Sequence, residues 1–116
     1  MKRLWNALLN SLAGLRWGFA SEAAIRQEIV LLALSLPVAP FLTHDPWKLA
    51  ALWGSLMILL TVELLNTGIE KLADRVTRDR DDLVRIAKDC GSAAVLLATI
   101  LCAMVWLMAL WQKLAA

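Results

Sequence analysis

The sequence of 116 residues contains no tyrosine, one histidine, three prolines and two cysteines, and only 19% of it is charged. So few cysteines exclude the disulfide scaffold of a small secreted domain, and the five glycines and three prolines exclude a collagen-like or low-complexity chain. Cys90 and Cys102 are about 18 Å apart along one predicted helix, which is too far for a disulfide. The formal net charge of +2 is too small to indicate a nucleic-acid partner.

Several catalytic motifs are absent as well. The chain has no Walker loop, no Gly-rich kinase loop, no His-Glu-x-x-His pair and no Gly-x-Ser-x-Gly elbow. Any phosphate chemistry in this protein therefore uses a scaffold unlike those of the familiar soluble enzymes.

Apolar residues are in excess. They make up 60% of the chain, against a usual share of about 45 to 50%, and the mean hydropathy is +0.65. A chain of this length forms at most one domain, and a small soluble domain must leave much of its surface in water. We therefore expect a single all-α membrane domain over residues 1–116, with much of its surface facing lipid.

The first 22 residues predict a helix that lies on the membrane surface. No compact apolar segment with a small-residue cleavage site follows Met1, so we do not expect a signal peptide. Apolar side chains recur at three- and four-residue spacing, namely Leu4, Trp5, Leu8, Leu12, Leu15 and Phe19. Polar side chains fill the other side, namely Lys2, Arg3, Asn6, Asn10 and Arg16. This pattern is typical of an amphipathic helix in the interface.

Three later segments predict membrane-spanning helices, over residues 25–43, 48–70 and 90–112. Pro37 and Pro40 are expected to end or kink the first of them. The third is free of charge in its interior, and Ala94, Ala98 and Cys102 form a ridge of small residues suited to close helix packing. Residues 71–89 are strongly charged and are expected to form a water-exposed, partly helical connection.

The basic residues predict the orientation. Ten of the twelve precede the first span or lie between the second and third, whereas only Lys48 and Lys113 fall on the other side. The positive-inside rule then places the N-terminus and the charged connection in the cytoplasm, and the C-terminus outside.

Acidic residues gather at the cytoplasmic ends of the spans. Counted from Leu49, Glu63 lies about 21 Å along the second span, which leaves about 9 Å to the edge of a 30 Å hydrocarbon layer. Asn66 and Glu70 share its helix face. A carboxylate inside the bilayer is costly, so Glu63 invites a functional hypothesis. Glu70 also fits an ordinary interfacial residue.

The other spans bring polar groups to the same layer. Glu22 and Glu28 flank the first span, and Arg26 is placed to pair with Glu22 four residues earlier. Two carboxylates, water and substrate phosphates together suit a magnesium ion, and a third carboxylate could act as a base. Most arginines near the helix ends, by contrast, fit solvated caps or topology signals.

Three segments resemble the small bacterial integral-membrane diacylglycerol kinases, in the same order and spacing along the chain. They are Ser-Glu-Ala-Ala-Ile-Arg-Gln-Glu from residue 21, Val-Glu-Leu-Leu-Asn-Thr-Gly-Ile-Glu from residue 62, and Ala-Lys-Asp-Cys-Gly-Ser-Ala-Ala-Val from residue 87. The resemblance implies a homotrimer of three-span subunits in the bacterial inner membrane, with active sites shared between subunits. It implies phosphorylation of diacylglycerol by ATP and Mg²⁺ to phosphatidic acid, in phospholipid recycling.

The resemblance also assigns roles by position. Glu63 matches the catalytic base, and Glu22 and Glu70 match the magnesium ligands, which also contact ATP. The positions that match nucleotide contacts are Arg3, Lys88 and Asp89, with Asp79, Arg80 and Asp81 near the adenine. The positions that match polar groups around the lipid substrate are Arg3, Glu28, Glu63, Asn66 and Ser92.

Some features depart from the family pattern and keep alternatives open. The residues from Asp79 to Asp81 differ in chemistry from the family, and Asn10 stands where an aromatic residue is usual, so the adenine contacts stay unassigned. The lipid acceptor could be undecaprenol rather than diacylglycerol. A proton-coupled transporter would also place an acid such as Glu63 in the membrane, but it would not need the polar cluster around Glu22 and Lys88.

Overall fold

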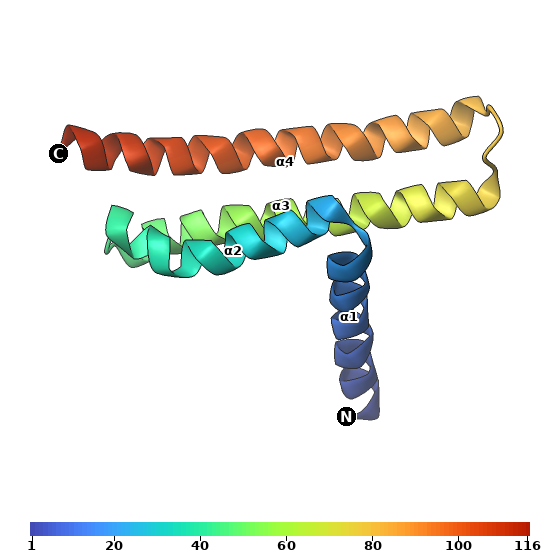
Figure 1. The fold of residues 1–116 in the computed structure, drawn as a ribbon, viewed down its shortest axis with the longest axis horizontal. Coiled ribbons are helices and arrows are strands. Elements are labelled where there is room, and N and C mark those ends of the chain that lie inside the picture. Colours follow the sequence, from blue (N-terminus) through green and yellow to red (C-terminus); the bar gives the residue numbers. More distant parts are fainter.

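The computed structural model describes residues 1–116, and all of its regular structure is helical. Four helices follow one another: α1 (Lys2–Ser21), α2 (Ala23–Leu42), α3 (Pro46–Val76) and α4 (Asp82–Ala115). Figure 1 shows α2, α3 and α4 running side by side along the long axis, whereas α1 runs across them. The last three helices are long and apolar enough to cross a membrane. The prediction of an all-helical chain with three such segments is confirmed.

The helices begin and end at residues that favour those boundaries. Asp45 precedes α3 and accepts a hydrogen bond from the backbone N–H of Trp47 at 2.9 Å, with Pro46 in the first helical position. Asp81 caps α4 in the same way, accepting from the N–H of Val84 at 3.0 Å. The charged connection predicted over residues 71–89 is therefore mostly helical, and only residues 77–81 lie outside α3 and α4.

The two prolines inside α2 do not end it. The helix continues through Pro37 and Pro40 to Leu42. Each proline removes one backbone donor from the helix. Nearby, the indole N–H of Trp53 in α3 donates to the carbonyl oxygen of Ser35 at 3.0 Å and ties this part of α2 to α3.

The core lies mainly between α3 and α4. Leu56 and Leu59 of α3 pack with Ala98 and Cys102 of α4, and both cysteines are free thiols. The indole N–H of Trp106 donates to the carbonyl oxygen of Leu52 at 3.1 Å, so its polar atom is satisfied within the apolar layer. Ala94, predicted as part of the small-residue ridge, is instead exposed. Gly91, Ala98 and Cys102 form the buried ridge of small residues instead. At 3.6 residues per turn, these three positions fall within about 40° of one another around the helix axis.

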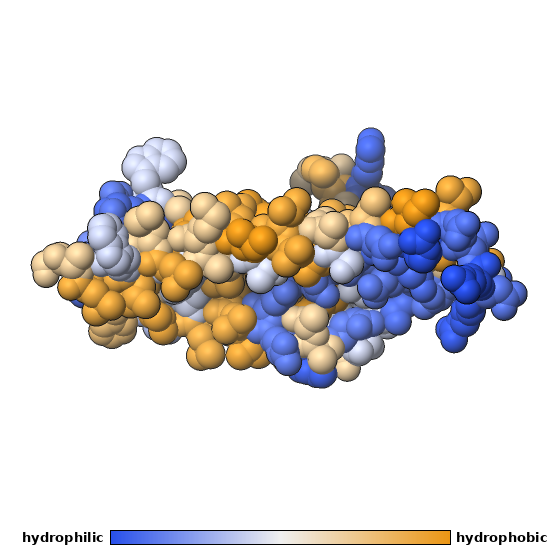
Figure 2. Space-filling view, turned by 90° about the horizontal axis from the view of Figure 1, so that it is seen from above, coloured by the Kyte–Doolittle hydropathy of each residue, from blue (hydrophilic) through white to orange (hydrophobic).

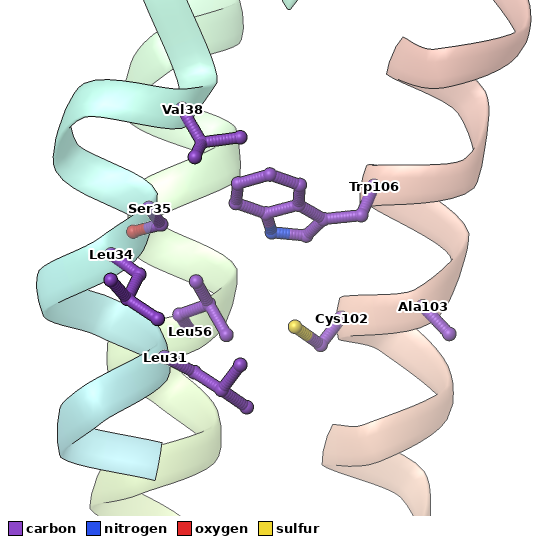
Figure 3. Close-up of a pocket in the computed structure, with 8 residues that line it drawn as sticks. All are labelled: Leu31, Leu34, Ser35, Val38, Leu56, Cys102, Ala103 and Trp106. Carbon is purple, nitrogen blue, oxygen red and sulfur yellow. The ribbon is translucent and has the colours of Figure 1, made fainter. Parts of the chain in front are cut away.

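A cavity of about 330 Å³ separates α2 from α4 in the apolar half of the bundle. Figure 3 shows Trp106 reaching from α4 toward Val38 and Ser35 of α2, with Leu56 of α3 behind. Leu31, Leu34, Cys102 and Ala103 complete the lining. The helices α2 and α4 are thus held together mainly through α3.

The outer surface is unusually apolar for a chain of this size. Only 15 of the 116 residues are buried, and the accessible surface of 8714 Å² exceeds the roughly 6,300 Å² of a compact soluble protein of the same mass. Figure 2 shows hydrophobic residues over one half of the bundle and hydrophilic residues gathered toward the end where α3 connects to α4. The apolar half therefore needs lipid or another subunit around it.

We predict that Leu56→Ala destabilises the protein by about 2 kcal/mol or more, because it removes packing atoms from the contact between α3 and α4. Leu97→Ala is the matched control, since Leu97 is 67% exposed on α4. Thermal unfolding in a mild detergent measures both. Equal losses for the two variants would contradict the assignment of the core.

Candidate functional site

Four glutamates lie together toward the polar end of the bundle. Glu22 stands at the corner between α1 and α2, Glu28 lies in α2, and Glu63 and Glu70 lie in α3. Glu63 and Glu70 lie seven residues apart on α3, about two helical turns, and Glu22 is joined to the same helix by an ion pair with Lys71. These are all of the glutamates in the chain, and three elements bring them toward the same end of the bundle; we call them the glutamate cluster.

Glu22 pairs with a residue that sequence reasoning did not select. Its Oε1 lies 3.2 Å from Nζ of Lys71 in α3. The expected partner, Arg26, instead donates from its guanidinium to the carbonyl oxygen of Phe19 at 3.2 Å. The prediction of a pair between Glu22 and Arg26 was wrong because Glu22 has an extended backbone at the corner, so the four-residue spacing of a helix does not direct its side chain.

Lys71 also fixes where α1 meets the bundle. Its Nζ lies 5.6 Å from the ring centroid of Trp17, within the range of a cation–π interaction. At the same corner, a Cβ on Gly18 would come within 3.0 Å of the side chain of Ile25, so glycine permits the close turn from α1 into α2. The corner thus places Glu22 beside α3 at Lys71, the residue that follows Glu70 in that helix.

Asn66 and Glu70, which were predicted to share one helix face, interact along α3. Nδ2 of Asn66 donates to Oε1 of Glu70 at 3.3 Å. Asn66 is buried, and its Oδ1 has no hydrogen-bond partner. Glu63, one turn before Asn66, is half-buried, and Oε2 of Glu28 in α2 is buried without a partner. Acceptor atoms that lack partners in a layer of like charges invite a proton donor or a cation.

Lys88 of α4 forms an ion pair that the sequence did not predict. Its Nζ lies 2.8 Å from Oδ1 of Asp74 in α3. Asp74 lies in the charged stretch beyond residue 70, outside the apolar part of α3, and the hydrogen bond from Lys88 lowers the pKa of its carboxyl group. No periodic pattern joins two residues on different helices, so nothing in the sequence singled out Asp74.

The remaining predicted residues do not reach the glutamates within one chain. Asp89 lies 3.4 Å from Arg85 on its own helix, and Ser92 is exposed. Arg3 is exposed in the first turn of α1, and Figure 1 shows that the N-terminal end of this helix lies away from the other three helices. These side chains are therefore open to contact from outside the chain.

The loop residues near the predicted adenine site have mixed roles. Asp81 uses its carboxylate to cap α4, as described above. The backbone N–H of Asp79 donates to Oγ1 of Thr77 at 3.0 Å, and neither Asp79 nor Arg80 forms an ion pair. Asp79 and Arg80 are exposed, and their side chains form no hydrogen bond or ion pair within this chain.

A hollow of about 330 Å³ near the end of α3 is lined entirely by charged residues. They are Lys71, Asp74, Arg75 and Arg78. Three cations around one acid give this end of α3 a positive potential, which attracts anions such as phosphate. Sequence reasoning treated Arg75 and Arg78 as solvated residues, and they remain exposed here.

Glu22 and Glu70 are the residues of this site that could hold a magnesium ion together with substrate and water. No three side chains among His, Cys, Asp and Glu come together as a ready-made metal cage. Glu22 and Glu70 each use one oxygen in a hydrogen bond or ion pair, on Oε1, which leaves Oε2 for a further ligand. Mg²⁺ prefers hard oxygen ligands and is commonly held by one or two carboxylates plus phosphate oxygens and water.

Comparison with known proteins identifies the family of this chain. The model of the family described as prokaryotic diacylglycerol kinase matches residues 9–110. A diacylglycerol kinase of Escherichia coli K12 is 39% identical over 110 residues, which cover 95% of this chain and 90% of that protein. One from Pseudomonas aeruginosa PAO1 is 40% identical over 106 residues, which cover 91% and 86%. One from Haemophilus influenzae Rd is 33% identical over 106 residues, which cover 91% and 90%.

The match covers α2 and α3 entirely and most of α4, reaches into α1, and includes every glutamate of the cluster. A chain with three membrane-capable helices and this similarity is a multi-pass bacterial membrane protein with lipid kinase activity. The resemblance inferred from the three segments is thereby confirmed, and the chain belongs to the prokaryotic diacylglycerol kinase family.

Proposed function

We propose that this protein transfers the γ-phosphoryl group of ATP to the hydroxyl of diacylglycerol, giving phosphatidic acid and ADP at the cytoplasmic membrane interface, in phospholipid recycling. The observation that carries this proposal is the cluster of four glutamates, with Glu63 inside the apolar part of α3 and Glu70 at its polar end. A water-soluble nucleotide and a lipid alcohol can meet only in such a boundary layer.

The depth of Glu63 suits a lipid hydroxyl. It follows Pro46, the first residue of α3, by about 26 Å of helix, against a hydrocarbon layer of about 30 Å. Measured from the other end, Glu63 lies about 12 Å before Lys71, where α1 meets α3. Both counts support a position just inside the inner edge of the hydrocarbon, where the glycerol hydroxyl of the substrate lies.

In this proposal Glu63 acts as the general base. Its carboxylate accepts the proton of the lipid hydroxyl as that oxygen forms a bond to the γ-phosphorus, and the bond from the γ-phosphorus to the bridging oxygen of ADP breaks. Glu28, Asn66 and Ser92 supply polar groups around the hydroxyl. The protein contributes mainly position and charge, because phosphoryl transfer needs little covalent participation from the enzyme.

The nucleotide side of the site is proposed to hold Mg²⁺ through Glu22 and Glu70. When bound, this ion neutralises charge on the phosphates. Lys88, Asp89 and Arg3 are assigned to the nucleotide phosphates, and the cationic hollow at the end of α3 supports an anion there. Asp79, Arg80 and Asp81 are assigned to the region of the adenine.

A homotrimer is the proposed functional state. Within one chain Arg3 and Ser92 lie exposed, and Asp89 contacts only its own helix. A neighbouring copy could bring such residues to the glutamates, and it would also cover part of the apolar surface that three helices leave open. We infer active sites that are shared between subunits.

The proposed orientation places the N-terminus and the site in the cytoplasm and the C-terminus in the periplasm. The ten basic residues on one side support it. The amphipathic helix α1 is proposed to lie on the cytoplasmic surface of the inner membrane. Its course across the other helices in Figure 1 is consistent with this placement.

We expect Glu63→Gln to lower the rate of lipid phosphorylation by at least about a hundredfold, because glutamine cannot accept the hydroxyl proton. The assay supplies purified protein with γ-labelled ATP, Mg²⁺ and either diacylglycerol or undecaprenol, and it counts label in the lipid. Thr61→Val is the control, since Thr61 is exposed and its hydroxyl bonds only to its own helix at Met57.

Turnover of Glu63→Gln near that of the wild type would contradict the assignment of the base. Preferential labelling of undecaprenol would identify that alcohol as the substrate. No labelled lipid from wild-type protein with any acceptor would overturn the proposed reaction.

For the proposed magnesium ligands, Glu22→Ala and Glu70→Ala should each raise the Mg²⁺ concentration for half-maximal activity on the order of tenfold, through the loss of one charged ligand. Asp82→Ala provides the control, because Asp82 is an exposed acid in the first turn of α4. A magnesium titration of each variant measures the effect. Titrations that match the wild type would remove Glu22 and Glu70 as ligands.

A further inference from the structure

Gly91 lies where α4 packs against the polar end of α3. It is buried, and the position that a Cβ atom would take is already occupied by Oδ1 of Asn66, with Cδ1 of Ile69 3.8 Å away. A Cβ on Gly54, Gly68 or Gly14 would meet no atom within 4 Å. Among these four glycines, only Gly91 has another residue's atom at the position of its own absent Cβ. That atom belongs to Asn66, which donates a hydrogen bond to Glu70.

The Asn66 amide has a fixed orientation. Nδ2 must face Glu70, because only the NH₂ group can donate to a carboxylate oxygen. Oδ1 then faces Gly91, and it has no N–H or O–H partner. The Hα of Gly91 that stands in place of a Cβ points at this oxygen, a contact of the weak C–H···O type that recurs between packed helices.

The amide also has little room to move. Asn66 is only 8% exposed, between its own helix and α4. An added methyl group at residue 91 would push Oδ1 away, and the side chain could yield only by rotating Nδ2 away from Glu70 or by separating the helices. The rotation releases Oε1 of Glu70 from its hydrogen bond, whereas separation of α4 from α3 would leave that bond in place, because Asn66 and Glu70 lie on the same helix.

We propose that Gly91 is a positioning residue for the cation site: it leaves the space that holds the Asn66 amide, and this amide in turn holds the Glu70 carboxylate in place for a divalent cation. This inference rests on the proposed role of Glu70 as a metal ligand. It adds a residue on α4 that touches neither metal nor substrate and acts only through Asn66.

Helix propensity alone predicts that Gly91→Ala stabilises α4 and gives no reason for weaker cation binding. Alanine is a better helix former than glycine, so Gly91→Ala and Gly54→Ala should both favour the helix. Any loss of cation affinity that is confined to Gly91→Ala therefore reports the contact with Asn66. Gly54→Ala is the matched control, since it makes the same chemical change in open space.

The experiment measures Mn²⁺ affinity by electron paramagnetic resonance, with the purified full chain and a non-hydrolysable ATP analogue. The proteins are the wild type, Gly91→Ala, Asn66→Ala, the double variant and Gly54→Ala. We expect Gly91→Ala to raise the Kd about tenfold in the wild-type background and less than about twofold in the Asn66→Ala background, as for residues in direct contact. Gly54→Ala should leave the Kd unchanged.

Equal losses in both backgrounds would overturn the inference and leave the proposed reaction intact. Wild-type protein that binds no Mn²⁺ would overturn both the inference and the proposed metal site, while lipid labelling would still test the reaction. If Gly91→Ala does not fold, removal of the Asn66 side chain should restore folding. A double variant that also fails to fold would contradict the proposed contact.

Discussion

The constraint on which the rest of this structure depends is that the hydrocarbon layer of a membrane does not accept unpaired charge. Three long apolar helices leave charged residues mainly to their ends, and the four glutamates lie toward one of those ends, with Glu63 the one within the apolar part of α3. In the proposed function, the constraint that limits where acids can lie also places them at the level where a lipid alcohol meets water. A chain with few buried residues can in this way form a site without a large core.

Much of the fold could be predicted from the sequence because each signal is local. Runs of apolar residues predicted three spans, and Asp45 and Asp81 stand at helix starts where their side chains cap the backbone. The shared face of Asn66 and Glu70 also followed from spacing within one helix. Hydropathy and helical period depend on near neighbours only, so a single sequence carries them.

Features that depend on how two helices meet could not be predicted. The ion pairs of Lys88 with Asp74 and of Lys71 with Glu22 join residues on separate elements, and the register between those elements leaves no periodic trace. The contact of Gly91 with Asn66 is of the same kind, because it joins two helices. The sequence does not show which residue of α3 lies against this glycine of α4. The expected pair of Glu22 with Arg26 was wrong for a related reason: a corner in the backbone redirected one side chain.

The proposed reaction depends most directly on the depth of Glu63 in the membrane relative to Glu70. Spin labels on Glu63→Cys and Glu70→Cys, in a chain with Cys90 and Cys102 replaced, can be tested in bilayers for collision with oxygen and with a water-soluble nickel complex. We predict a label at residue 63 that lies in the hydrocarbon within about 12 Å of the interface, and a label at residue 70 that lies in the headgroup layer. Two labels with equal access to water, or a residue 63 label at the bilayer centre, would contradict the account.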